Sequence, residues 1–212
     1  MPNFFIKPNS TPENEKGSTV GHAVPRISDR GFESDGFELC VPQGVHLTSG
    51  HVRLEHQAFY TLRLSNLRST RCNAKVMIDG KEIGVWRIES QSKIELERPV
   101  GDVGRFTFYR LNSAGAAAAG LSATEQMGLV TVVFIPERTA SSYDDVPMFS
   151  RRQGDARGGT GLSGLSGQKF TPAESIDLDH ASAVTIYARL VAHDSSARPL
   201  SPLSPVVPSP LP

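Results

Sequence analysis

A glycine-rich run, Gly159-Thr160-Gly161-Leu162-Ser163-Gly164, has the letters of a dinucleotide-binding fingerprint. In that fingerprint a strand precedes the glycines and a helix follows them, so that backbone amides point at a pyrophosphate. Here a polar segment, 151–158, precedes the run and Pro172 follows it, which predicts a loop. A P-loop would need a Gly-Lys-Ser/Thr ending, which the run lacks. We therefore expect no cofactor, and a loop that packs on the domain edge or becomes ordered on a partner.

Tight acidic groupings occur at Asp144-Asp145 and at Asp177-Leu178-Asp179-His180. In an extended segment, Asp177 and Asp179 would point to the same side and could share a hard cation such as calcium. A solvated turn before the last strand explains the same residues, and we favour that interpretation. We therefore expect no metal site.

Histidine and cysteine positions do not resemble a zinc site, because no histidine has a familiar ligand spacing from Cys40 or Cys72. His46, His51 and His56 are close in sequence, but surface histidines on adjacent strands are the favoured interpretation. Each cysteine lies in a strand-like run. Two buried, reduced thiols are favoured, and a disulfide between them stays open.

Nucleophilic catalysis is not indicated, because the chain has no Gly-x-Ser-x-Gly elbow and neither cysteine has a known nucleophile's flanking sequence. We therefore expect that the protein is not an enzyme. A basic cluster, Arg63, Arg68, Arg71 and Lys75, surrounds a predicted strand connection. It could contact a phosphate, an acidic sugar or a protein partner, although glutamates on neighbouring runs predict a mixed-charge surface.

The composition is balanced, with 22 basic and 22 acidic residues, so it provides no overall attraction to nucleic acid or acidic lipid. No run approaches the roughly 20 apolar residues that span a bilayer. Residues 1–16 lack the charged and apolar regions of a signal peptide, so we expect a soluble protein made in a reducing compartment such as the cytoplasm.

Alternating apolar and polar residues predict strands along most of the chain. The predicted strands are 37–41, 45–48, 51–56, 58–65, 71–78, 81–88, 93–97, 104–111, 128–135 and 183–193. Asp79-Gly80 predicts a tight hairpin, and the only tryptophan, Trp86, is a predicted core anchor. One helix is expected within 114–127. The fold class is therefore all-β, and a two-layer antiparallel β-sandwich, such as a jelly roll, is expected.

The ends of the chain differ from its middle. Residues 1–30 are predicted to form a flexible arm, 31–194 the β-sandwich domain with a long loop at 136–175, and 195–212 a disordered proline-rich tail. Within the arm, Phe4, Phe5 and Ile6 are three adjacent large apolar residues. They are expected either to dock on the core or on a neighbouring subunit, or to be a frayed end.

A pattern within residues 55–192 resembles uncharacterised β-rich proteins of large DNA viruses and tailed phages. It is carried by Arg63-Leu64-Ser65-Asn66, Arg71-Cys72-Asn73-Ala74, Ile78-Asp79-Gly80, Gly84-Val85-Trp86-Arg87-Ile88, Glu97-Arg98-Pro99, Phe106-Thr107-Phe108, Gly128-Leu129-Val130, Gly161-Leu162-Ser163-Gly164, Gln168-Lys169-Phe170 and Arg189-Leu190-Val191. The resemblance implies a β-rich module associated with a virion, and it implies no active site.

The first functional hypothesis is a noncatalytic structural or surface-attachment component of a larger particle. Its partners would be protein subunits, including copies of itself, and Phe4, Phe5, Ile6, Arg63, Arg68 and Arg71 are the candidate contact residues. The alternative is a lectin-like or adhesin-like module that binds carbohydrate. That function needs Tyr60, Trp86 or Tyr109 to be exposed as a ring on which a sugar stacks, and Asp177 and Asp179 could hold calcium beside it.

Overall fold

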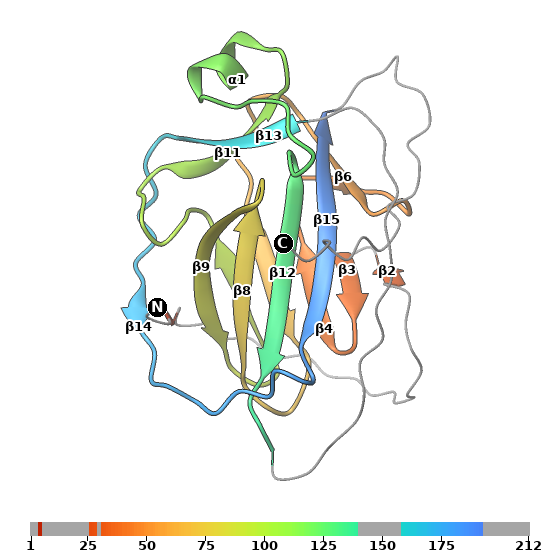
Figure 1. The fold of residues 1–212 in the computed structure, drawn as a ribbon, viewed down its shortest axis with the longest axis vertical. Coiled ribbons are helices and arrows are strands. Elements are labelled where there is room, and N and C mark those ends of the chain that lie inside the picture. Colours follow the sequence, from red (N-terminus) through yellow and green to blue (C-terminus); the bar gives the residue numbers. More distant parts are fainter. Residues whose placement is uncertain (1–3, 6–25, 29–30, 140–157, 193–212) are drawn as a thin grey trace, which may run out of the picture.

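The computed structural model describes residues 4–5, 26–28, 31–139 and 158–192. These residues contain fifteen strands in three sheets and one short helix (Figure 1). The prediction of a mostly β chain with one short helix is therefore confirmed.

Sheet A has eight strands in the order β14-β1-β9-β8-β12-β15-β6-β5. Their bounds are Thr171–Pro172 (β14), Phe4–Phe5 (β1), Lys81–Ile88 (β9), Cys72–Ile78 (β8), Leu129–Pro136 (β12), Val184–Ala192 (β15), His51–Leu54 (β6) and Val45–His46 (β5). Strand β1 runs parallel to β9, and β15 runs parallel to β6. The other neighbours in this sheet are antiparallel.

Sheet B has five antiparallel strands in the order β10-β7-β4-β3-β2, and sheet C pairs β11 with β13. The bounds in sheet B are Ser92–Leu96 (β10), Leu62–Asn66 (β7), Phe37–Cys40 (β4), Gly31–Ser34 (β3) and Arg26–Ser28 (β2). Sheet C consists of Arg105–Arg110 (β11) and Gly158–Ser163 (β13), and helix α1, Ala114–Ala118, follows β11. Sheet C and α1 lie together at one end of the molecule (Figure 1).

The core lies where the inward side chains of sheets A and B meet. Phe37 of β4 stacks on Phe134 of β12, with 4.7 Å between the ring centroids. Trp86 of β9 is fully buried, which confirms its predicted place as a core anchor. Alternation along β9 explains this, because Trp86 and Ile88 point to the same face of a pleated strand.

The predicted helix is short, as its glycines led us to expect. Helix α1 begins after the N-cap Ser113, whose hydroxyl accepts the N–H of Ala116, and it ends at Ala118. Gly120 then takes a φ of +67°. Glycine adopts this left-handed backbone without strain and so terminates the helix. Residues 121–127 form turns and irregular chain.

Five strands lie outside the predicted ones: β1, β2, β3, β13 and β14. Gly158–Ser163, which we assigned to the long loop, forms strand β13, and Thr171–Pro172 in the same loop forms β14. Arg26–Ser28, which we assigned to the arm, forms β2 at the edge of sheet B. Residues 140–157 and 193–212 lie outside the described residues, as does Ile6.

The glycines of β13 have a packing role that their sequence did not reveal. A Cβ atom at Gly158 would lie 2.2 Å from Cζ of Phe108, and one at Gly161 would lie 2.6 Å from Cε2 of Tyr109. These distances are shorter than any van der Waals contact, so only glycine lets β13 lie against the two rings. The run that resembles a dinucleotide fingerprint is thus largely a strand.

The predicted hairpin at Asp79-Gly80 is confirmed, since φ is +53° and +77° at its two central residues. The carboxylate of Asp79 also joins three segments of the chain. Its Oδ1 accepts the backbone N–H of Gly128 at 2.5 Å, and its Oδ2 accepts that of Thr160 at 2.7 Å. Burial raises the pKa of this carboxyl. The two hydrogen bonds attach the β8–β9 hairpin to the start of β12 and to sheet C.

Replacing Asp79 with asparagine is expected to lower the free energy of unfolding by about 1 to 2 kcal/mol. Asparagine suits the left-handed backbone here, but it has one acceptor oxygen, so its amide would face one of the two N–H groups. Removing the charge relieves part of the desolvation cost without restoring that acceptor. Urea denaturation followed by circular dichroism measures the change.

Asp102 provides a matched control, because it is exposed and accepts the Gly104 N–H through a single oxygen, Oδ1. An asparagine there keeps that acceptor, and its effect should stay within about 0.5 kcal/mol. Equal losses in D79N and D102N would contradict the role of Asp79.

Candidate interaction surface

Residues 57–60 extend sheet C, because they pair with the edge of β11 that does not face β13. The N–H of Tyr60 donates to the carbonyl of Phe106 at 3.1 Å, and the N–H of Phe108 donates to that of Ala58 at 2.9 Å. Phe106 and Phe108 are buried beneath this small sheet. The sheet is therefore fixed to the core through its inward face.

Four exposed apolar residues belong to segments that meet at one end of sheet C, and we call these four residues the apolar platform. Phe59 is 43% exposed, Val103 57%, Leu162 40% and Leu165 80%. Among the described residues, two other large apolar side chains are exposed, Val45 and Leu67. Single exposed apolar residues are ordinary on protein surfaces, so these four are distinguished by the fact that their segments adjoin.

The platform residues meet where β11 begins and β13 ends. Arg105 and Ser163 are paired at this point, and the guanidinium of Arg105 lies 4.7 Å from the ring centroid of Phe59. The N–H of Ser166 donates to the carbonyl of Val103 at 2.9 Å, which holds the chain after β13 beside the start of β11. This hydrogen bond places the backbone just after Leu165 beside that of Val103.

The segment after Leu165 is fixed by the side chain of Gln168 along the edge of β10. Its amide nitrogen donates to the carbonyl of Glu95 at 2.6 Å, and its amide oxygen accepts the N–H of Glu97 at 3.1 Å. A neighbouring strand would bond the same two groups, so Gln168 covers an otherwise open sheet edge. The hydroxyl of Ser166 also donates to Glu97, at 3.0 Å. Leu165 is thus exposed on a rigid support.

Each of the three arginines predicted as partner contacts forms an ion pair within the chain. Arg63 donates to Glu95 at 2.8 Å, Arg68 pairs with Asp35, and Arg71 pairs with Glu137. The Arg71 pair is bidentate, with Nε to Oε2 at 2.9 Å and Nη2 to Oε1 at 2.5 Å. Glu137 holds the pKa of Arg71 above its usual range, and Arg71 lowers that of Glu137.

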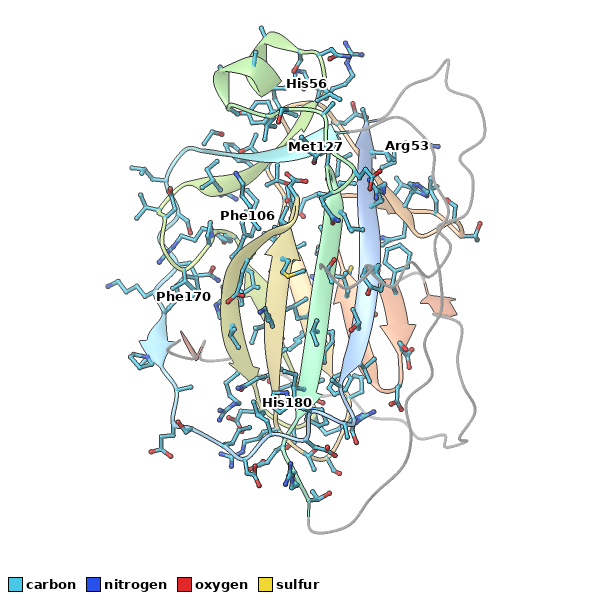
Figure 2. The ribbon with its side chains drawn as sticks, in the orientation of Figure 1. Arg53, His56, Phe106, Met127, Phe170 and His180 are labelled. Carbon is cyan, nitrogen blue, oxygen red and sulfur yellow. The ribbon has the colours of Figure 1, made fainter. Side chains whose placement is uncertain are left out.

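The candidate histidines make separate contacts. Nε2 of His46 accepts the N–H of Val41, Nδ1 of His51 lies 3.0 Å from the hydroxyl of Ser49, and Nδ1 of His56 accepts the N–H of Arg110. His56 and His180 lie at opposite ends of the molecule (Figure 2). In the described part of the chain, no three His, Cys, Asp or Glu residues are grouped to hold a metal.

Asp179 caps a turn before the last strand, the interpretation that we favoured, and Asp177 lies just before that turn. Oδ1 of Asp179 accepts the N–H groups of Ala181 and Ser182, and Oδ2 accepts the hydroxyl of Ser182 at 2.7 Å. These bonds lower the pKa of Asp179. Asp177 lies 3.8 Å from Nε of Arg138. Asp144 and Asp145 lie outside the described residues.

Both cysteines are free and buried, which confirms the favoured prediction of two reduced thiols. Burial raises the pKa of Cys40, and it raises that of Cys72 to about 12. Each side chain therefore remains a neutral thiol at physiological pH, a form that is a poor nucleophile.

Sequence reasoning did not find the apolar platform. Leu162 and Leu165 were the available signal, because they are the large apolar residues of a segment that is otherwise glycine, serine and polar side chains. Among the described residues, no helix is long and apolar enough to cross a membrane. The chain matches no family model, no curated protein and no solved structure.

Proposed function

We propose that this protein is a noncatalytic structural or surface-attachment component of a larger particle, such as a virion, and that it acts through protein–protein contacts. In this proposal sheets A and B are the two layers of a β-sandwich of the jelly-roll class. The supporting observation is the apolar platform, Phe59, Val103, Leu162 and Leu165, at one end of sheet C.

Burial of the platform would favour association, since each square ångström of apolar surface removed from water contributes about 25 cal/mol. Part of that gain is usually lost in fixing mobile side chains and loops. Gln168 and Ser166 already fix the backbone beside Leu165, so this ordering cost is small. Exposed polar residues, Asp102 and Lys169, flank the platform in sequence and suit the polar rim of an interface.

Replacing Leu165 with glutamate tests the platform. The side chain is 80% exposed, so folding should be unaffected, whereas a buried charge at the interface should weaken association at least about tenfold. The measurement is the amount of tagged protein that sediments with assembled particles from the native source. Circular dichroism and thermal unfolding establish that the variant is folded.

Leu67→Glu is the matched control, because Leu67 is also an exposed leucine, 48% exposed, in the connection between β7 and β8. It should incorporate like the unmodified protein. Equal incorporation of the two variants, or a protein that never sediments with particles, would refute the proposal.

The carbohydrate-binding alternative needs aromatic rings that a sugar can reach. Tyr60 and Trp86 are buried, and the Tyr60 hydroxyl lies 2.6 Å from that of Thr160. Tyr109 packs against Gly115 of α1 and Gly161 of β13. This arrangement favours protein contacts over sugar stacking as the proposed function.

A further inference from the structure

The N-terminal strand β1 fills a gap between two segments that are distant in sequence, and we call this gap the β1 slot. One wall is the edge of β9, where Phe4 and Phe5 pair in parallel with Trp86 and Arg87. The other wall is β14, Thr171–Pro172, which pairs antiparallel with the same two residues. Among the described strands, β1 is the only partner of β14.

The walls of the β1 slot are held together by contacts that do not involve β1. The ring of Phe170, just before β14, meets the indole of Trp86 edge-to-face, with 5.9 Å between centroids. Just after β14, the carbonyl of Glu174 accepts a hydrogen bond from Nη2 of Arg87 at 2.9 Å. Arg87 is itself buried and also donates to Asn73. The slot can therefore form before any strand enters it.

The edge of β9 is open to a new strand only over a short length. The carbonyl of Ile83, nearer its start, already accepts the N–H of Val100 at 3.0 Å. A two-residue strand at Trp86 and Arg87 fits the part that remains, and its bonds are made by backbone groups. The strand Phe4–Phe5 of any copy of this chain can supply these backbone groups.

Many residues separate β1 from the next described strand in sequence. Strand β1 lies beside β14 at one side of the molecule, and β2 lies at the opposite side (Figure 1). Residues 6–25 join them, and a chain of this length spans at most about 70 Å. That reach covers the slot of the same molecule and the slot of a molecule packed against it.

We propose that in the assembled particle the β1 slot of each molecule receives the N-terminal strand of a second copy of this chain. A strand from a second copy makes the same backbone hydrogen bonds in the slot as the molecule's own strand. The exchanged and unexchanged states therefore differ mainly in the effective concentration of the incoming strand near the slot. Packing of copies in a particle raises that concentration. The inference rests on the proposed function and names one partner, a second copy.

A disulfide between two differently tagged chains reports the exchange directly. Phe5 and Thr171 are paired in antiparallel strands, and their Cα atoms are about 4.5 to 5.5 Å apart, within the range of a disulfide. Chains carrying Phe5→Cys and chains carrying Thr171→Cys are mixed unfolded, refolded together under reducing conditions at about millimolar protein, which stands in for the packing of copies in a particle, and then oxidised. We expect a disulfide-linked heterodimer on a non-reducing gel.

Ser122→Cys replaces Thr171→Cys in the control, because Ser122 is exposed and lies in the chain after α1. Heterodimer no more abundant than in this control would overturn the inference. The F5C/T171C double variant, refolded without the other chains at the same protein concentration, gives the second measurement. Disulfide-linked oligomers are expected, and disulfides formed only within single chains, or no disulfide at all, would overturn the inference.

The disulfide readout is separate from the test of the apolar platform. L165E in the same mixture should leave the F5C–T171C heterodimer unchanged, because Leu165 lies outside the slot. A chain lacking residues 1–5 should abolish exchange. Particle incorporation without any heterodimer would refute the strand exchange alone. Normal particle incorporation of L165E would instead refute the proposed function.

Discussion

Replacing Trp86 with alanine is expected to lower the free energy of unfolding by about 3 to 5 kcal/mol. The indole is fully buried in β9 and contacts Phe170. Its fit is close, because a Cβ atom at Gly84 would lie 2.8 Å from Cη2 of the indole. Alanine would leave a cavity that these neighbours cannot fill. Urea denaturation followed by far-ultraviolet circular dichroism measures the loss, since the variant has no tryptophan fluorescence.

Trp86→Phe separates the lost volume from the lost N–H group. The buried Nε1 atom of Trp86 has no hydrogen-bond partner among the described residues, so phenylalanine removes an unsatisfied donor along with part of the ring. We expect W86F to lose about 1 to 2 kcal/mol. If W86F lost as much as W86A, the indole would make a polar contact that this geometry lacks.

The elements predicted correctly are those in which a local pattern determines the structure. Along β9 the side chains alternate, and this period of two was enough to place Trp86 inward. The hairpin at Asp79-Gly80 followed from residue types that accept positive φ. Strands β8, β10, β11, β12 and β15 lie within two residues of their predicted bounds for the same reason.

The elements that sequence reasoning missed depend on contacts between distant residues. Strand β13 contains three glycines in six residues, and glycine has a low intrinsic preference for strands. Its place is fixed by β11, about fifty residues earlier, and by the rings that need the space above its glycines. Strand β1 is two residues long, too short for any alternation to be visible.

The candidate site was missed for a related reason. Exposure of Leu165 and Phe59 is a property of the tertiary structure, and in sequence the two residues are far apart. The charges of the basic cluster are visible in the sequence, whereas their partners in ion pairs are not. Arg71, for example, pairs with Glu137 across 66 residues.

Replacing Gly158 with alanine is expected to lower the free energy of unfolding by about 3 kcal/mol. The new Cβ atom would lie 2.2 Å from Cζ of Phe108, and the Phe108 ring is fully buried, so it has no space into which to move. Strand β13 would have to separate from β11. Hydrogen exchange of the Thr160 amide, which donates to Asp79, reports this separation locally, while urea denaturation reports it globally.

Gly167→Ala is the matched control, because a Cβ atom at Gly167 meets nothing within 4 Å. Its effect on the free energy of unfolding should stay within about 0.5 kcal/mol.

The two variants should also differ in their effect on assembly, since β13 carries Leu162 and leads directly to Leu165. G158A should lose particle incorporation together with protection of the Thr160 amide, and G167A should keep both. Unchanged protection in G158A would mean that β13 does not pack against Phe108, and the apolar platform would then lack its rigid support.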